Sequence, residues 1–139
     1  MKFGIGQSVP RTEDPRLITG AGQFTDDIQL PDQLHLRVLR SPYAHGCISE
    51  LDISAAQAMD GVCAIYTAND IRQLGPLPCR AQLKDASGNP AFIPRRPILA
   101  EHSVLYVGQP IAAVVATTRS QAQNAVEAIL LSVYEQPAC

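Results

Sequence analysis

The feature that most constrains this 139-residue chain is the uneven distribution of its eleven prolines and nine glycines. Most of them fall in two segments, residues 1–33 and residues 75–97. Proline removes a backbone donor, and both residue types interrupt regular structure, so neither segment can hold a long helix or a long central strand. We predict an extended N-terminal arm over residues 1–33 and a long loop over residues 75–97, a length at which loops commonly cover a neighbour.

Between these segments the apolar pattern predicts short strands and helices. Residues 34–40 and 47–53 alternate in the period of a half-buried strand, and the β-branched run 62–67 is typical of a buried strand that includes Cys63. We expect Ser54 to cap a short helix that ends at Asp60 and Gly61, with Ala55, Ala56 and Met59 toward the core. Asn69 is expected to cap one helical turn through residue 74.

The C-terminal part gives the clearest helix. Residues 104–107 and 110–116 read as two strands separated by a bend at Gly108 and Gln109. Thr118 and Gln121 have capping-box spacing, the helical spacing of Ala122, Ala125, Val126 and Ile129 follows, and residues 131–134 alternate as a final strand.

This order predicts an α/β (α+β) fold: a two-layer sandwich of a mixed sheet with helices on one face, preceded by the arm. The predicted division is therefore an arm over residues 1–33 and one globular domain over residues 34–139. A chain of this size can bury a single core.

Charge and composition exclude several classes of function. The net charge is -2, and no basic run exceeds the pair Arg95 and Arg96, which argues against nucleic acid binding. The four cysteines form no C-x-x-C pair and no short Cys–His cluster, so we expect reduced thiols and no metal site. No apolar stretch approaches a membrane span, and we expect a cytoplasmic protein.

The residues predict no catalytic, cofactor-binding or metal site. The chain has no G-x-S-x-G, H-E-x-x-H, phosphate loop or G-x-G-x-x-G after a strand. His45, after a strand, is the best single polar candidate, with a hydrogen-bonded structural role as the alternative. Asp26 with Asp27 could bind a cation but suits a turn, and Arg95 with Arg96 could hold an anionic cofactor or face solvent or a partner. His35 and His102 are expected to be ordinary half-exposed residues.

Four motifs in order resemble one known family. They are residues 11–20 (RTEDPRLITG) with Gly22, Phe24, Asp26 and Asp27; residues 40–45 (RSPYAH); residues 67–71 (TANDI); and residues 104–112 (VLYVGQPIA) with residues 133–135 (VYE). Together with residues 4–6 (GIG), they resemble the start of the molybdenum-containing large subunit of xanthine dehydrogenases, aldehyde oxidases and carbon monoxide dehydrogenases. The globular part resembles that family's α/β hammerhead domain, and the resemblance covers essentially the whole chain.

The resemblance implies a scaffold domain. In the family, molybdopterin and the catalytic glutamate belong to later domains, and no position of this chain matches them, so no cofactor is expected here. The RSP and VGQP segments are expected to have a packing role. Gly46 departs from the alanine more common in the family, which is expected to loosen a turn at most.

Two functions therefore remain open from the sequence. One is a non-catalytic structural domain from a split or truncated large subunit, inactive alone, whose partners are the remaining domains or subunits. The alternative is a stand-alone interaction module that self-associates as a homo-oligomer without enzymatic activity. A small independent enzyme would need a site that the sequence does not contain, and the parent enzyme's substrate cannot be named.

Overall fold

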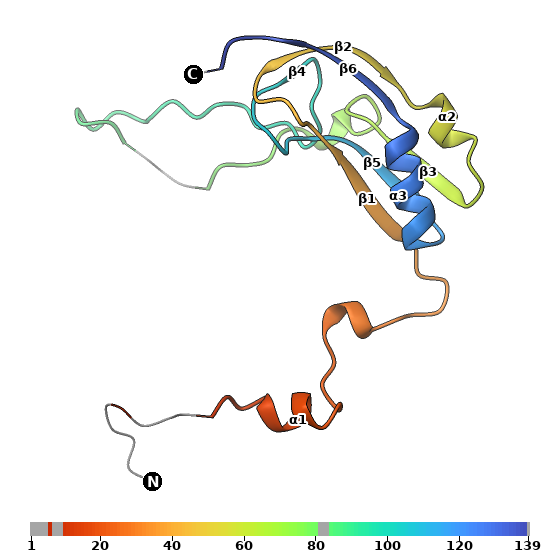
Figure 1. Ribbon diagram of the computed structural model, residues 1–139. Helices are drawn as coiled ribbons and strands as arrows, with labels where there is room; N and C mark the ends of the chain where they lie inside the picture. Colours follow the sequence, from red (N-terminus) through yellow and green to blue (C-terminus); the bar gives the residue numbers. More distant parts are fainter. Residues whose placement is uncertain (1–5, 7–9, 81–83, 139) are drawn as a thin grey trace. The chain divides into compact units, whose positions relative to one another are not determined.

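The computed structural model describes residue 6, residues 10–80 and residues 84–138, and Figure 1 shows its elements. The chain divides into two units, residues 1–33 and residues 34–139. The motif at residues 4–6 lies largely outside the described residues, with only Gly6 included.

The first unit consists of turns and two very short helices. These are α1 (Asp14–Ile18) and η1 (Thr25–Asp27). Pro15 stands in the first turn of α1, where its missing N–H costs nothing. No described residue of this unit is buried, so it has no core of its own. Its large apolar side chains are exposed: Leu17, Ile18, Phe24, Ile28 and Leu30.

The second unit contains two three-stranded sheets. One has the order β1 (His35–Arg40), β5 (Pro110–Ala116), β3 (Val62–Tyr66), and the other β4 (Ser103–Val104), β2 (Gly46–Asp52), β6 (Leu130–Glu135). Every strand pair in both sheets is antiparallel. The α/β fold is as predicted, but the strands form two antiparallel sheets in place of one mixed sheet.

Helix α3 (Arg119–Ala128) packs on the first sheet (Figure 1). Its predicted cap is confirmed, because the Thr118 hydroxyl accepts a hydrogen bond from the Gln121 amide at 3.2 Å. Ala122 and Ala125 are fully buried. Small side chains on the buried face let the helix lie close to β1 and β5. Ala125 belongs to the core that this helix forms with Ala112 and Val114 of β5.

A second cluster joins the two sheets. Its buried residues are Ala100, Val104 and Ile111, and Ile48, Leu131 and Val133 of the second sheet pack against them. Leu39 and Leu51 contact both clusters, so the two sheets and α3 share one continuous apolar interior.

Several local predictions are corrected by the structure. Of the strand expected at residues 104–107, only Val104 lies in a strand, β4 (Ser103–Val104). Cys63 is exposed and not core, because a bulge between Val62 and Ala64 breaks the alternation of β3.

The two short helices also begin differently from the prediction. Ser54 is the first residue of helix α2 (Ser54–Gln57) and not its cap; the N-cap is Ile53, which makes no side-chain hydrogen bond, and the Asp52 carboxylate accepts the Ser54 amide. Ala56 is buried, Met59 is half-buried and Ala55 is exposed. The 3₁₀ helix η2 (Arg72–Leu74) has no side-chain cap, and Asn69 accepts a hydrogen bond from Arg72.

Within the part of the chain that the structure describes, no helix is long and apolar enough to cross a membrane.

Candidate functional site: two interlocked loops

Two loops that are far apart in the sequence meet beside the β1–β5 pair. One follows β1 and begins at Ser41, and the other, residues 105–109, leads into β5. The Ser41 amide donates to the Gln109 carbonyl oxygen at 2.9 Å, and the Gly108 amide donates to the Ser41 carbonyl oxygen at 2.7 Å. These bonds extend the strand pairing beyond the irregularity at Leu39 and Arg40 and fix both loops to each other.

The side chains of both loops are used in the same contact. Ser41 and Gln109 are 2% and 3% exposed, so each needs a hydrogen-bond partner within the protein. The Ser41 hydroxyl accepts from the Tyr43 amide at 3.0 Å, and the Gln109 Oε1 accepts from the Leu105 amide at 2.7 Å. The Arg40 guanidinium donates to the Gly108 carbonyl oxygen at 2.9 Å.

This hydrogen bonding fixes the bend of the second loop at Gly108. Gly108 has a φ of +86°, a conformation that side-chain-bearing residues rarely adopt. The residues before it, Leu105, Tyr106 and Val107, are 56%, 50% and 64% exposed. The interlocked loops therefore present three consecutive apolar side chains on a fixed backbone, which suits contact with another apolar surface more than chemistry.

His45 has a structural partner. Its Nδ1 lies 2.8 Å from the Pro137 carbonyl oxygen, and the Gln136 amide donates to the His45 carbonyl oxygen at 3.0 Å. The best polar candidate from the sequence thus fastens the end of β6 to the start of β2, which is the structural role stated as its alternative.

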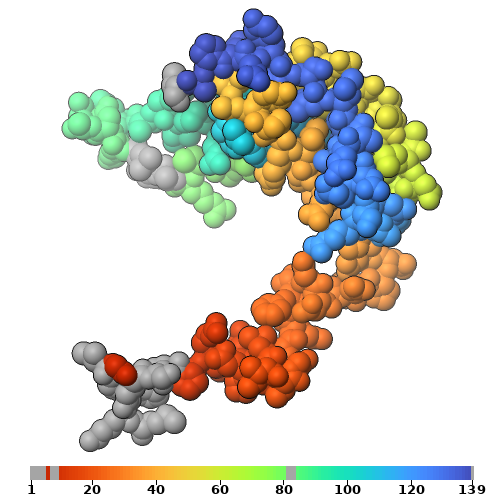
Figure 2. All heavy atoms as spheres, viewed as in Figure 1, coloured from red at the N-terminus to blue at the C-terminus, as the bar shows by residue number. Residues whose placement is uncertain are grey.

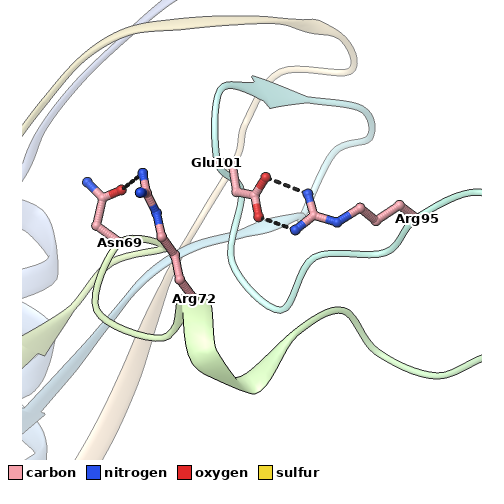
Figure 3. A network of polar contacts seen from close by, with 4 residues as sticks. All are labelled: Asn69, Arg72, Arg95 and Glu101. Carbon is pink, nitrogen blue, oxygen red and sulfur yellow. Dashed lines mark hydrogen bonds and ion pairs between the residues drawn. The ribbon is translucent and has the colours of Figure 1, made fainter.

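A second polar cluster lies beside η2 (Figure 3). Arg95 donates to both carboxylate oxygens of Glu101, at 2.6 and 2.7 Å, and Arg72 donates to the Asn69 side chain at 2.6 Å. The hydrogen bonds from Arg95 lower the pKa of Glu101 below its ordinary value and outweigh the opposing effect of burial. Arg95, expected either to hold an anion or to face solvent or a partner, is engaged by Glu101.

The hollow beside this cluster is small. It has a volume of about 20 Å³, with Arg72, Arg95 and Glu101 in its wall. A hollow of that size holds about one water molecule. Two more open hollows of about 420 and 210 Å³ lie along the arm, and both have Glu13 and Leu17 in their walls.

The remaining candidates are dispersed. Asp27 accepts a hydrogen bond from the Phe24 amide at 2.9 Å inside η1, the turn role expected for it. His35 lies half-buried in β1 and His102 is exposed in a loop. Across residues 10–80 and 84–138, no three histidine, cysteine or acidic side chains gather closely enough to hold a metal ion.

Comparison with known proteins identifies the family. Residues 19–137 match the family model described as aldehyde oxidase and xanthine dehydrogenase, a/b hammerhead domain. The chain belongs to this family. Its Ser41 and Gln109 loops are thus part of a hammerhead domain, as the resemblance implied.

Named relatives and solved structures agree with this assignment. The chain is 40% identical over 129 residues to the nicotine 6-hydroxylase large subunit of Paenarthrobacter nicotinovorans, covering 93% of this chain and 15% of that protein. It is 30% identical over 132 residues to the nicotinate dehydrogenase large molybdopterin subunit of Eubacterium barkeri, covering 95% of this chain and 28% of that protein. The crystal structure of quinoline 2-oxidoreductase from Pseudomonas putida 86 superposes with a TM-score of 0.81 at 34% identity, covering 99% of this chain and 17% of that one.

The hollow at Arg95 does not fit the family's cofactor. Family enzymes depend on molybdopterin, a ligand far larger than the one-water hollow at Arg95. The polar side chains of the interlocked loops are also directed into their own backbone. The chain spans about 15% of the length of its relative from P. nicotinovorans.

Proposed function

We propose that this chain is a non-catalytic structural domain of a molybdopterin-dependent oxidoreductase, of the xanthine dehydrogenase, aldehyde oxidase and carbon monoxide dehydrogenase large-subunit type. The observation that carries the proposal is the interlock of Ser41 and Gln109, whose buried polar groups bond to the protein itself. A reactive site needs polar groups that converge on open space. Here they stabilise a scaffold instead.

The proposal includes the partners of this scaffold. They are the remaining domains or subunits of a molybdenum hydroxylase, which would hold molybdopterin and carry out the hydroxylation. The exposed apolar residues Leu105, Tyr106 and Val107 support this, because such side chains on a fixed loop are typical of a surface that another domain covers. Relatives such as the carbon monoxide dehydrogenase large chain of Hydrogenophaga pseudoflava are about seven times longer than the matched region.

Co-expression tests the proposal. The chain carries an affinity tag and is produced together with a separate polypeptide that contains the remaining domains of a molybdenum hydroxylase large subunit. We expect that polypeptide to be retained with the tagged chain and the purified complex to contain molybdenum. A tagged chain that purifies alone, with no molybdenum in the eluate, would contradict the proposed role.

The alternative is a stand-alone module that self-associates. The same exposed residues 105–107 would then meet a second copy of the chain. Light scattering after size-exclusion chromatography separates the two functions, since a scaffold awaiting other domains is expected to be a monomer and the module a dimer or larger. A cytoplasmic location stays a prediction that cell fractionation would test.

A further inference from the structure

The first sheet has one covered face and one open face. Along β5, Ala112, Val114 and Ala116 are fully buried on the side that α3 covers. Alternate residues of a strand point to opposite faces, so Ala113 and Val115 lie on the other side. Within the described part of residues 34–138, the helices that make substantial contact with the first sheet are α3 and α2, and these two also contact each other.

The strand register places two apolar rows on this open face. Val115 pairs with Leu36 on one side and Ala64 on the other, and Ala113 pairs with Val38 and Tyr66. Leu36 is 59% and Tyr66 45% exposed, and the other four residues are half-buried. We call these six residues the apolar sheet face: Leu36, Val38, Ala64, Tyr66, Ala113 and Val115.

Exposed apolar residues occur elsewhere in the same unit, such as Leu130 and Tyr134 of β6, but charged residues stand among them or near them. The second sheet carries Glu50 and Asp52, and the outer side of α3, which lies open in Figure 2, carries Arg119, Gln123 and Glu127. An antiparallel sheet with one solvated face normally places polar residues on it. The apolar sheet face has no charged residue among its six positions, so its composition is that of a surface hidden from water.

We infer that the apolar sheet face is the docking surface for the cofactor-binding remainder of a molybdenum hydroxylase large subunit, an inference that rests on the proposed function. The length outside this chain favours that occupant. The match covers 93% of this chain but only 15% of the nicotine 6-hydroxylase large subunit, so most of a subunit of that kind lies outside the matched region. The open face is built from the central strand β5 and both its neighbours, which are rigid elements suited to a permanent interface.

Two other occupants are distinguishable from this one. A second copy of the chain would bury the same six residues in a symmetric dimer. The chain's own arm, with its exposed apolar side chains, would bury them within a monomer. Each gives a different result in the experiment below.

The test uses a matched pair of leucines in the co-expressed complex. Leu36→Glu places a charge on the apolar sheet face, and Leu130→Glu places the same charge on β6 of the second sheet, where Leu130 is 52% exposed. Both positions are open to solvent, so both variants should fold, which circular dichroism and thermal unfolding verify. We expect Leu36→Glu to weaken binding of the remaining polypeptide by about tenfold or more and Leu130→Glu to leave it within about twofold, because burying a charge is costly.

The outcomes separate this inference from the proposed function. If the unaltered chain does not bind the remaining polypeptide, the proposed function fails and the inference fails with it. If the unaltered chain binds and Leu36→Glu binds equally well, the proposed function stands and the docking surface is wrong. Conversion of a dimer to a monomer by Leu36→Glu, without weaker binding, would assign the face to a second copy. Hydrogen exchange could show that β1 is protected as strongly in the free chain as in the complex, and that this protection is lost when residues 10–33 are deleted. That result would assign the apolar sheet face to the arm.

Discussion

The backbone amide of Ser41 donates to the carbonyl oxygen of Gln109 at 2.9 Å, which joins two loops that are 68 residues apart in the sequence. Each residue also uses its side chain to hold its own loop. The contact is therefore both a link between β1 and β5 and the support of the exposed residues 105–107. It makes this pair the first target for mutation.

Replacing Gln109 with alanine is expected to destabilise the domain by about 1–3 kcal/mol, because the Leu105 amide loses its acceptor at a part-buried position. Thermal unfolding measures this directly. Gln123→Ala is the control, since Gln123 lies exposed on α3 and bonds only to Glu127 in an i,i+4 pair that contributes about 0.2–0.5 kcal/mol. Equal stability of the two variants would show that the interlock does not hold the loop.

Gly46→Ala is expected to destabilise the domain by about 1–3 kcal/mol through overpacking. The sequence suggested that glycine here loosens a turn, but Gly46 is a buried residue of β2. An added Cβ would lie 2.6 Å from Val133 Cγ1 and 2.7 Å from the Tyr134 carbonyl oxygen. Cys47→Ala, at the exposed neighbouring position, serves as the control. Urea unfolding that ranks the two variants equally would mean that β6 moves aside at little cost.

Ala125→Leu tests the close packing of α3. The Ala125 side chain is fully buried in the core, so a larger side chain must displace Ala112 or Val114. We expect a loss of about 1–3 kcal/mol by chemical denaturation. Asn124→Leu adds a leucine one position away on the exposed side of the same helix and should change stability by less than about 0.5 kcal/mol. The idea fails if the leucine at 125 is accommodated as easily as that at 124.

The Arg95–Glu101 pair predicts a pH dependence. Its hydrogen bonds lower the pKa of Glu101 in the folded state, so its contribution to stability is present above the unfolded value, roughly 4.3, and is lost as the pH falls through the lower folded value. An NMR titration should therefore give Glu101 a pKa below the ordinary glutamate value, and Arg95→Gln should return it toward that value. Arg96→Gln is the control and should have no effect; a similar shift from both variants would point to general charge and not to this pair.

Elements governed by neighbouring residues could be predicted from the sequence. The helix at residues 119–128 follows from a local cap and a local apolar period, and both are confirmed. The strands at residues 35–40, 46–52, 62–66, 110–116 and 130–135 also follow the predicted runs closely. Division of these strands into two antiparallel sheets could not be foreseen, because the pairing of Gly46 with Glu135 depends on residues 89 positions apart.

For the same reason, only part of the candidate site could be predicted from the sequence. Both loop motifs were assigned a packing role, yet nothing local shows that Ser41 contacts Gln109. Residues 105–107 have the composition of a strand, but the Gln109 side chain takes the Leu105 amide and Gly108 adopts a positive φ, which ends the strand at Val104. A single bulge likewise leaves Cys63 exposed, although the run at residues 62–67 was expected to be a buried strand.

Two distant parts of the long segment between η2 and β4 meet at one hydrogen bond, which the Leu77 amide donates to the Arg96 carbonyl oxygen at 2.8 Å. The described residues between these two, 78–80 and 84–95, belong to a side branch whose ends are already joined. Lengthening a loop of this kind costs little closure entropy, about 0.6 kcal/mol for each doubling. We therefore expect relatives of the domain to differ in length more readily between positions 77 and 96 than within its strands.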